Sequence, residues 1–351
     1  MHLAGGLLRD FARGCDVLGG GGGSQARHAL PLAAHAIEQT GPVQVVEVGE
    51  LPSEGLVMPC SFLGAPAIGA ERIGTGREAA TLRGHLERHF GQPVVAMLCN
   101  GIGGIHGGIS VVLAAHAGLP LLDADGMGRA FPGMSLVSMH LAGVAPEPVL
   151  LADEHDRVVA VHAGGVWAER MARSVVVGFG DRGVSSEYVM TVDQVAGAVI
   201  EGSVSKALRI GELIGQAASV ADAARAIAAE FDGVLIAEGK VTAALPEPGR
   251  HTSATIEGTG SDLGRRLRLE VGDEHLAVIE DGQAIATVPD IITVFDTYTG
   301  ETLGAGELRY GQRVVALALP CPEVWRTPAG LDLAGPAAFG LDLPYRPVVA
   351  S

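Results

Sequence analysis

The sequence has very little lysine, and its acidic residues outnumber its basic ones. Lysine occurs only at Lys206 and Lys240, and neither follows the glycine pattern of a phosphate-binding P-loop, which excludes that kind of nucleotide site. The chain has 24 Lys and Arg residues against 40 Asp and Glu, a formal net charge of -16. Because nucleic acids and anionic membranes bind basic surfaces, we expect neither as a partner.

The sequence also lacks long hydrophobic runs and paired cysteines. No segment approaches the roughly 18 apolar residues of a membrane-spanning helix, and the amino terminus shows no basic stretch followed by an apolar one. We therefore expect a cytoplasmic protein. The cysteines lie far apart without a Cys-x-x-Cys pair, which predicts reduced thiols instead of disulfides or a zinc knuckle. They are Cys15, Cys60, Cys99 and Cys321.

Apolar residues, in contrast, are abundant. The chain has 351 residues, of which 48% are hydrophobic, enough for two domains and a large core. Its first part alternates short apolar runs with helical segments, a pattern typical of a parallel sheet covered by helices. We expect strands over 43–48, 56–62, 93–99, 119–123 and 135–141, and helices over 26–39, 77–90 and 109–117.

The second part has a different pattern. Residues 149–151 and 157–161 predict a hairpin at the edge of the first sheet. Helical segments follow, and Ser219 with Asp222 predicts a capped helix that ends near Phe231. Farther on, the apolar residues alternate with period two, which indicates strands. We expect these over 266–271, 276–279, 284–288, 291–295 and 314–319, with a turn at Asp281-Gly282.

These patterns predict an α/β protein of two domains. The first, residues 1–170, has a mostly parallel or mixed sheet. The second, residues 171–351, contains a helical bridge (171–231), a β-rich part (232–330) and a carboxyl-terminal segment. We also expect a homo-oligomer, because subunits so rich in Ala and Gly often self-associate.

Two carboxylates, Asp123 and Asp125, end a predicted buried strand, and Gly126, Gly128 and Arg129 follow them. Residues two apart in an extended segment point to the same side, so the acids repel unless a cation, a shared proton or donors compensate them. Arg129 is a candidate counter-charge. The alternative is a capped turn, in which one acid accepts backbone amides and the other faces water. The pattern leaves both interpretations open.

Glycine-bearing turns precede or follow several predicted strands. In an open parallel sheet such turns gather at the ligand-binding edge. The glycines at 19–23 allow backbone amides to approach a ligand, although a flexible loop with Ser24 as a helix cap is the alternative. Gly101, Gly103 and His106 nearly match a dinucleotide fingerprint, but the third glycine is missing, so we expect no nucleotide cofactor.

Three residue types near these turns could carry chemistry. His106 stands at a presumed helix start and could be an acid, a base or a metal ligand, or simply a solvated side chain. Cys99 ends a strand beside Asn100 and could be a nucleophile or an apolar filler. The histidines show no metal-binding spacing, so a zinc site would have to be assembled from distant positions.

Segments along nearly the whole chain resemble one known family. They are LPLLDADGMGRAFPGM at 119–134, LGGGGGS at 18–24, and TVPDIITVFDTYTGE, LRYGQRVVALALP and WRTPAGLDLAGPAAFG between 287 and 340. Together they are similar to the family of the domain of unknown function DUF917, which is associated with S-methyl thiohydantoin desulfurase. The resemblance implies an α/β amino-terminal part and a β-rich carboxyl-terminal part.

The resemblance also implies an activity. The expected enzyme is a hydrolase in which water attacks C2 of a five-membered S-methyl thiohydantoin ring, releasing methanethiol and leaving a hydantoin. This reaction needs a general base and either hydrogen-bond donors or a divalent metal such as zinc. The alternative is a non-catalytic accessory or ligand-binding subunit of a hydantoinase or oxoprolinase system.

The expected site combines the acidic hallmark with the glycine turns. The catalytic candidates are Asp123, Asp125, His106 and Cys99. The small-molecule substrate is expected to contact Gly22, Gly23, Ser24, Asn100, Gly103, Gly104, Gly126 and Arg129. Where the family pattern has an acid before an Ile-Gly-Gly triplet and an Asn after it, this chain has Gly101 and His106. Either the substrate differs or His106 has taken over a polar role.

Overall fold

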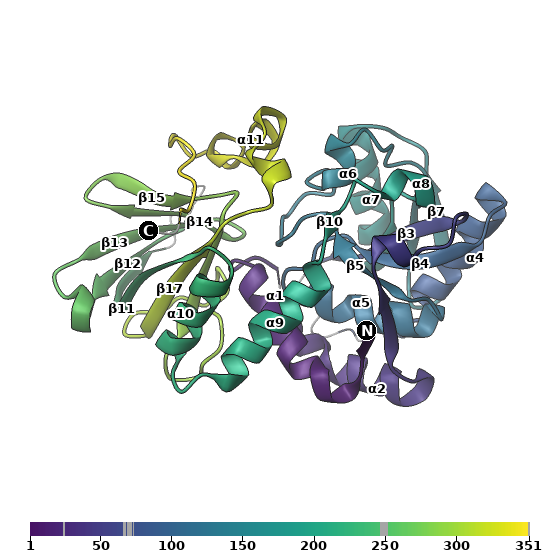
Figure 1. The fold of residues 1–351 in the computed structure, drawn as a ribbon. Helices are drawn as coiled ribbons and strands as arrows, with labels where there is room; N and C mark the ends of the chain where they lie inside the picture. The colour runs from purple at the N-terminus through teal and green to yellow at the C-terminus, as the bar shows by residue number, and fades with distance from the viewer. Residues whose placement is uncertain (24, 66–67, 69–71, 73, 246–251, 350–351) are drawn as a thin grey trace.

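Two β-sheets form the framework of the molecule, with helices around the first and between the two (Figure 1). The computed structural model describes residues 1–23, 25–65, 68, 72, 74–245 and 252–349. Among these residues no helix has the length and apolar character needed to cross a lipid bilayer. The four cysteines are buried and free, which confirms the predicted reduced thiols.

The first sheet is mixed, and its order is β1-β2-β5-β4-β3-β8-β6-β7, with β10 beside β5 and β9 beside β3. Strands β2, β5, β4 and β3 run parallel, so their carboxyl ends share one edge. This confirms the predicted α/β class. The strands are β1 His2–Leu3, β2 Val43–Val46, β3 Leu56–Gly64, β4 Val94–Cys99, β5 Leu121–Asp125, β6 Val149–Ala152, β7 Val158–Val161, β8 Arg182–Ser186, β9 Met190–Thr191 and β10 Ile200–Glu201.

The helices largely follow the expected patterns. The helix predicted over 26–39 begins as a 3-10 turn, Ala26–Ala29, and continues as α2 with Pro31 in its first turn, where the missing N–H costs no hydrogen bond. Ser219 caps α10 by accepting from the Asp222 amide at 3.1 Å, as predicted. The helices are α1 Leu8–Leu18, α2 Leu30–Thr40, α4 Glu78–Phe90, α5 Ile105–Ala117, α6 Ser138–Leu141, α7 Val166–Gly178, α8 Val192–Val195, α9 Ser203–Gln216, α10 Val220–Glu230 and α11 Pro328–Ala334.

The strand predicted over 135–141 is wrong. This segment folds as a turn followed by α6, because the Ser138 amide donates to Gly126 O at 2.6 Å and its hydroxyl donates to Ala198 O at 2.7 Å. These bonds hold the segment over the turn after β5, where Val137 and Met139 are still buried. The apolar residues of this segment are therefore buried here without a strand, and Ser138 between them is buried as well.

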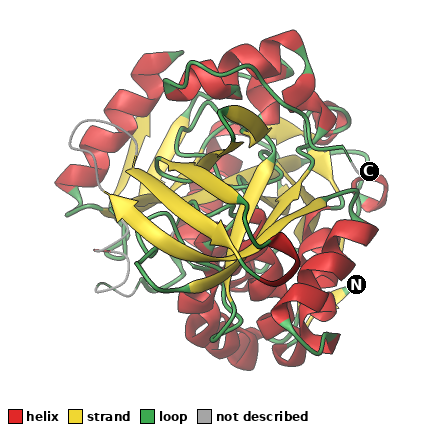
Figure 2. Cartoon of the chain, turned by 90° about the vertical axis from the view of Figure 1, so that its left-hand side faces the viewer, coloured by secondary structure: helices red, strands yellow, loops and turns green. Residues whose placement is uncertain are grey.

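The second sheet is antiparallel throughout, in the order β15-β14-β13-β12-β11-β17-β16, and Figure 2 shows it curled. The predicted strands appear, and so does the turn at Asp281-Gly282, where both residues have positive φ (49° and 78°). The pattern missed β11 and β12. The strands are β11 Val234–Leu245, β12 Thr252–Gly258, β13 Arg266–Val271, β14 His275–Glu280, β15 Gln283–Thr287, β16 Ile291–Asp296 and β17 Arg313–Leu319.

The region between the two sheets is smaller than the bridge predicted over 171–231. Strands β8, β9 and β10 come from that region but pair with the first sheet. Helix α9 contacts α1 and β5, and α10 packs on β11 and β17 of the second sheet. Helix α9 lies against α1 (Figure 1), and glycines make this close crossing feasible. A Cβ added to Gly14 would stand 1.7 Å from Ala207 O, and one added to Gly211 would stand 1.7 Å from Asp10 O.

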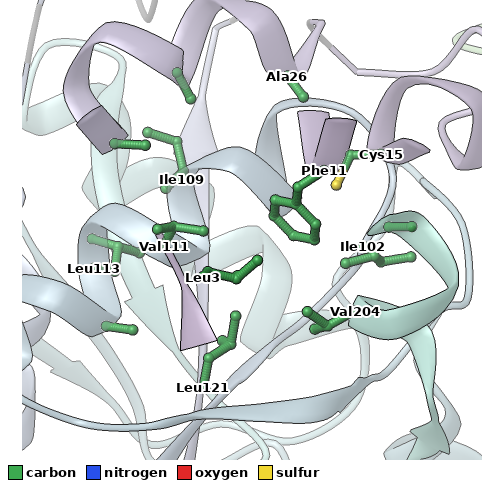
Figure 3. Packing of buried hydrophobic residues seen from close by; sticks show 14 of the residues in the cluster. Leu3, Phe11, Cys15, Ala26, Ile102, Ile109, Val111, Leu113, Leu121 and Val204 are labelled. Atoms are coloured by element: carbon green, nitrogen blue, oxygen red, sulfur yellow. The ribbon is translucent and has the colours of Figure 1, made fainter. Parts of the chain in front are cut away.

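One hydrophobic core extends under both sheets. Phe11 of α1, Ile109 of α5, Leu121 of β5 and Val204 of α9 pack together in it (Figure 3). The same cluster includes Phe295 of β16 and other side chains of the second sheet. Burying each large apolar side chain contributes about 1.5–3 kcal/mol. The shared core therefore holds the two sheets in one arrangement.

Candidate active site

A cavity of about 780 Å³ lies where loops of the first sheet meet loops of the second. The first half of the chain contributes the glycine loop 21–23, the end of β3, the turn after β4 and the segment 127–134. The second half contributes the loop 272–274 before β14 and the turn 304–307 between β16 and β17. The cavity thus opens at the carboxyl ends of the parallel strands, where α/β proteins bind small ligands.

Glu187, directly after β8, supplies a buried carboxyl group to the cavity wall. Its side chain is 1% exposed, and Asn100 Nδ2 donates to its Oε1. Its Oε2 has no hydrogen-bond partner among the described residues. Burial raises the pKa of Glu187 to about 7, although hydrogen bonds from Ser185 and Asn100 oppose the shift. A carboxyl group with such a pKa can accept or release a proton near neutral pH.

Asn100 follows β4 and faces the same cavity, where sequence reasoning expected it to meet the substrate. Its backbone carbonyl accepts from the Gly126 amide at 3.0 Å, which fixes the turn. Its side chain is 3% exposed, and Oδ1 has no partner in the described part of the chain. Asn100 therefore orients Glu187 with its amide nitrogen and keeps an acceptor oxygen for a ligand.

Glu274 brings a second buried carboxyl group, from the loop between β13 and β14 of the second sheet. It forms an ion pair with Arg129, and both side chains are at most 1% exposed. Burial raises the pKa of Glu274 to about 7, although Arg129 lowers it. Arg129 Nη1 also donates to Asp290 O at 2.8 Å. Arg129 therefore neutralises Glu274 and joins the two halves, and it is not the counter-charge of Asp123 and Asp125 considered above.

His106 lies in the first turn of α5 and lines the cavity. It is partly buried, and loss of hydration lowers its pKa to about 4. The imidazole is therefore neutral at pH 7 and offers one donor and one acceptor nitrogen. His106 thus lies at the cavity, and its polar role there stays a prediction.

The glycine loop forms another wall of the cavity. Gly21, Gly22 and Gly23 line it, whereas Ser24 lies outside the described residues. Gly21 has a φ of 80°, and a Cβ added there would stand 2.6 Å from the His275 ring. The His275 amide donates to Gly20 O at 2.9 Å. Glycine is therefore required by both the backbone conformation and the close approach of the second domain.

Asp123 and Asp125 lie behind the cavity wall and do not line it. Asp123 caps α9, because its carboxylate accepts from the Ser205 amide at 2.9 Å and from the Ser205 hydroxyl. Asp125 Oδ2 accepts from the amides of Ile102, Met127 and Gly128 at 2.8–3.1 Å, and burial raises its pKa to about 6. These are the contacts of the capped-turn interpretation, except that Asp123 caps a helix instead of facing water.

Four other predicted site residues also pack behind the wall. Cys99 is 0% exposed and donates its thiol hydrogen to Gly101 O at 3.0 Å, and burial raises its pKa well above the usual value, which disfavours the nucleophilic thiolate. A Cβ added to Gly103 would stand 2.4 Å from Ala130 N, and one on Gly126 would stand 2.9 Å from Asn100 O. The Gly104 amide donates to Cys15 O at 2.7 Å. These glycines allow the turns to pack closely.

The described residues do not form a metal site of the usual kind. Within the described ranges, no three side chains of His, Cys, Asp and Glu gather closely enough to hold an ion. The zinc considered from the sequence therefore has no ligand set in this part of the chain.

Sequence reasoning missed the acidic residues of the cavity. Glu187 follows β8, which lies in a region read as helical, so its place at a strand end was not recognised. Glu274 stands in the loop between β13 and β14, and no pattern distinguishes it from a solvent-exposed loop acid. The strand order, which brings β8 beside β3, is what places Glu187 opposite Asn100.

Comparison with known proteins gives consistent matches along the chain. The S-Me-THD-like N-terminal domain matches residues 7–163, and the S-Me-THD-like C-terminal domain matches residues 163–348. An X-ray crystal structure of a protein from Chromobacterium violaceum, a Northeast Structural Genomics Consortium target, is similar with a TM-score of 0.85 and 24% identity. The similarity covers 99% of this chain and 100% of that one and shows the same fold. No curated protein matches the chain.

Proposed function

This chain belongs to the S-Me-THD-like family, and from that premise we propose that it hydrolyses a small five-membered ring as an S-methyl thiohydantoin desulfurase. In the proposed reaction, water attacks ring C2, methanethiol leaves and a hydantoin remains. The observation that carries the proposal is the buried carboxyl group of Glu187, held by Asn100 at the cavity with a pKa raised to about 7.

The buried acceptor atoms of the cavity wall favour a ligand rich in N–H groups. Glu187 Oε2, Asn100 Oδ1 and Glu274 Oε1 are acceptor atoms without a partner in the described part of the protein. A buried acceptor left unpaired costs about 1–3 kcal/mol, so a ligand that donates to it gains affinity. An S-methyl thiohydantoin ring carries one N–H donor, and protonation of its second nitrogen adds another.

The proposed mechanism assigns the proton transfers to Glu187. Its carboxylate removes a proton from water while the water oxygen bonds to C2. The C2–S bond then breaks, and methanethiolate leaves. Of the two water protons, one ends on the ring nitrogen and the other on sulfur, so the products are a hydantoin and methanethiol. The neutral imidazole of His106, at the same cavity, is placed to hydrogen-bond the ring or the attacking water.

The test is thiol release from an S-methyl thiohydantoin, followed with a thiol-reactive dye. We expect Glu187→Gln to lower kcat by at least about 100-fold, because it removes the base and keeps the side-chain shape. Glu201→Gln is the matched control, since Glu201 is an exposed carboxylate at β10 outside the cavity. We expect it to react at the wild-type rate.

Two outcomes would contradict the proposal. If wild-type protein binds the ring and releases no thiol, the chain is a ring-binding accessory subunit and not the hydrolase. If Glu187→Gln keeps the wild-type rate, the base is another group.

A further inference from the structure

The described wall of the cavity carries more negative than positive charge. Four carboxyl side chains line it, at Glu187, Asp273, Glu274 and Glu307. Among the described lining residues, Arg173 is the sole arginine or lysine. Charge in a confined cleft selects ligands of opposite sign more strongly than the same charge on an open surface.

Arg173 is already engaged and contributes little to binding an anion. Its Nε and Nη2 donate to Glu169 Oε1 at 2.8 and 2.7 Å. Nη2 also donates to Pro132 O at 2.9 Å. Because Glu169 neutralises this guanidinium, a carboxylate on the ligand finds no free positive partner among the described lining residues.

Asp273 and Glu307 form the acidic mouth of the cavity. Both are exposed, and they stand on two different loops of the second sheet. Glu307 is held in place, since it accepts from Gln25 Nε2 at 2.7 Å and from the Gly304 amide at 2.8 Å. These donors are neutral, and neither acid forms an ion pair with a described basic side chain. Their charges are therefore available to a ligand.

The polar residues of the cavity wall thus fall into two chemically distinct groups. In the buried group, Glu187, Asn100 and Glu274 are at most 3% exposed, and each has an oxygen without a partner in the described protein. At the mouth, Asp273 and Glu307 carry uncompensated charge. A ring that donates to the buried group has the exposed carboxylates of the mouth on the same cavity wall, within the space open to its substituent.

Resting on the proposed function, we propose that the preferred substrate is a five-membered ring whose side group is cationic, an amine or a guanidinium, and that Asp273 and Glu307 select it. A neutral alkyl group is accepted less well, and a carboxylate is disfavoured. Coulomb attraction at about 6–8 Å in a partly hydrated site corresponds to roughly threefold to tenfold in preference for each carboxylate.

The first test compares three S-methyl thiohydantoins that differ at C5, with an aminobutyl, an isobutyl or a carboxyethyl group. We expect kcat/KM to fall in that order, with about tenfold or more between the aminobutyl and carboxyethyl rings. Raising the salt from roughly 0.01 M to roughly 1 M shortens the Debye length from about 30 Å to about 3 Å, so the ratio should fall toward one. Equal values for the three rings, or a faster carboxyethyl ring, would overturn the inference.

The second test removes the charge at the mouth. In Asp273→Asn with Glu307→Gln, we expect the aminobutyl-to-carboxyethyl ratio of kcat/KM to fall about tenfold or more. The control pair, Glu257→Gln with Asp342→Asn, removes two exposed charges elsewhere and should leave the ratio unchanged. An equal fall of the ratio in the control pair would show a general effect of net charge. It would contradict the proposal that Asp273 and Glu307 select the side group.

A binding measurement separates this inference from the proposed function. If wild-type protein releases thiol from none of the rings, the proposed function fails, and calorimetry with the corresponding hydantoins still measures the charge preference. Tighter binding of the aminobutyl hydantoin, lost in the mouth variant, supports the inference. Equal binding of all three, or binding of none, overturns it.

Discussion

Individual side chains in the cavity owe their reactivity to burial. Glu187 would ionise at acidic pH in water, but loss of hydration makes its neutral form competitive near pH 7. The hydrogen bond from Asn100 opposes this by stabilising the anion. The balance between these two effects sets the pH at which Glu187 can act as a base.

A pH profile tests this balance. Because the base must be deprotonated, we expect kcat/KM to rise about tenfold per pH unit below pH 7 and to level off above it. Asn100→Leu removes a hydrogen bond that lowers the pKa, so the rising limb should move to higher pH. A limb that stays in place in Asn100→Leu would show that another group titrates.

The sequence predicted part of this site for a physical reason. Asn100, His106 and the glycines at 22–23 lie at the ends of parallel strands or in adjacent turns, and local patterns reveal such positions. Asp123 and Asp125 could not be resolved in the same way, because their spacing suits both a reactive pair and a capped turn. Which of the two interpretations holds depends on the donors to these carboxylates. Ser205, which donates to Asp123, is distant in sequence, and Ile102, which donates to Asp125, belongs to another turn.

Helix α1 and helix α9 show how small residues determine the arrangement of secondary structure. Their backbones approach closely at Gly14 and Gly211, where any side chain would overlap the partner helix. Gly215 lies one turn farther along α9, and a Cβ added there would meet nothing nearer than Asp10 Oδ1 at 3.5 Å. Of the two glycines in α9, Gly211 therefore has no room for a side chain against α1, whereas Gly215 has room for one.

Alanine substitution in α9 separates packing from helix propensity. We expect Gly211→Ala to lower the free energy of unfolding by about 1–3 kcal/mol, because the added methyl group forces the helices apart. Gly215→Ala should leave it unchanged or raise it by up to about 1 kcal/mol, because alanine favours the helix. Urea denaturation of both variants checks this. Equal effects at the two positions would contradict the close crossing.

Secondary structure was predictable where the alternation of apolar and polar residues comes only from burial of one face of a strand. Residues 266–271 alternate because one face of β13 is buried, and the predicted bounds agree with the strand. Residues 135–141 alternate as well, but their burial comes from a turn that packs on the first sheet. Strands β11 and β12 contain alanines, glycines and charged residues that weaken the alternation, so local reasoning missed them.

The two halves of the molecule are joined by polar contacts around Arg129. The guanidinium is 0% exposed, pairs with Glu274 and donates to the carbonyls of Pro289 and Asp290. Trp325 Nε1 adds a bond to Met127 O at 2.8 Å. These contacts connect the turn after β5 to the segments beside the second sheet.

Removing one partner of the buried ion pair should be costly. We expect Arg129→Met to lower the free energy of unfolding by about 3–5 kcal/mol, since it leaves Glu274 buried without its counter-charge. Adding Glu274→Gln to that variant should recover part of the loss, because the remaining side chain is then uncharged. Urea titrations of the two single variants and the double variant check this. Strictly additive losses would show that the pair is not coupled.

The division of the cavity wall between the two sheets has an evolutionary consequence. The group proposed to break the carbon–sulfur bond, Glu187, follows β8 of the first sheet, whereas Asp273 and Glu307 lie in loops of the second sheet. Changes in those loops can therefore retune which side group is accepted without altering the reactive carboxyl. Related proteins can then differ in the substrate side group that they prefer while they keep the same reaction. Grafting one of these loops from one protein to another would transfer the side-group preference.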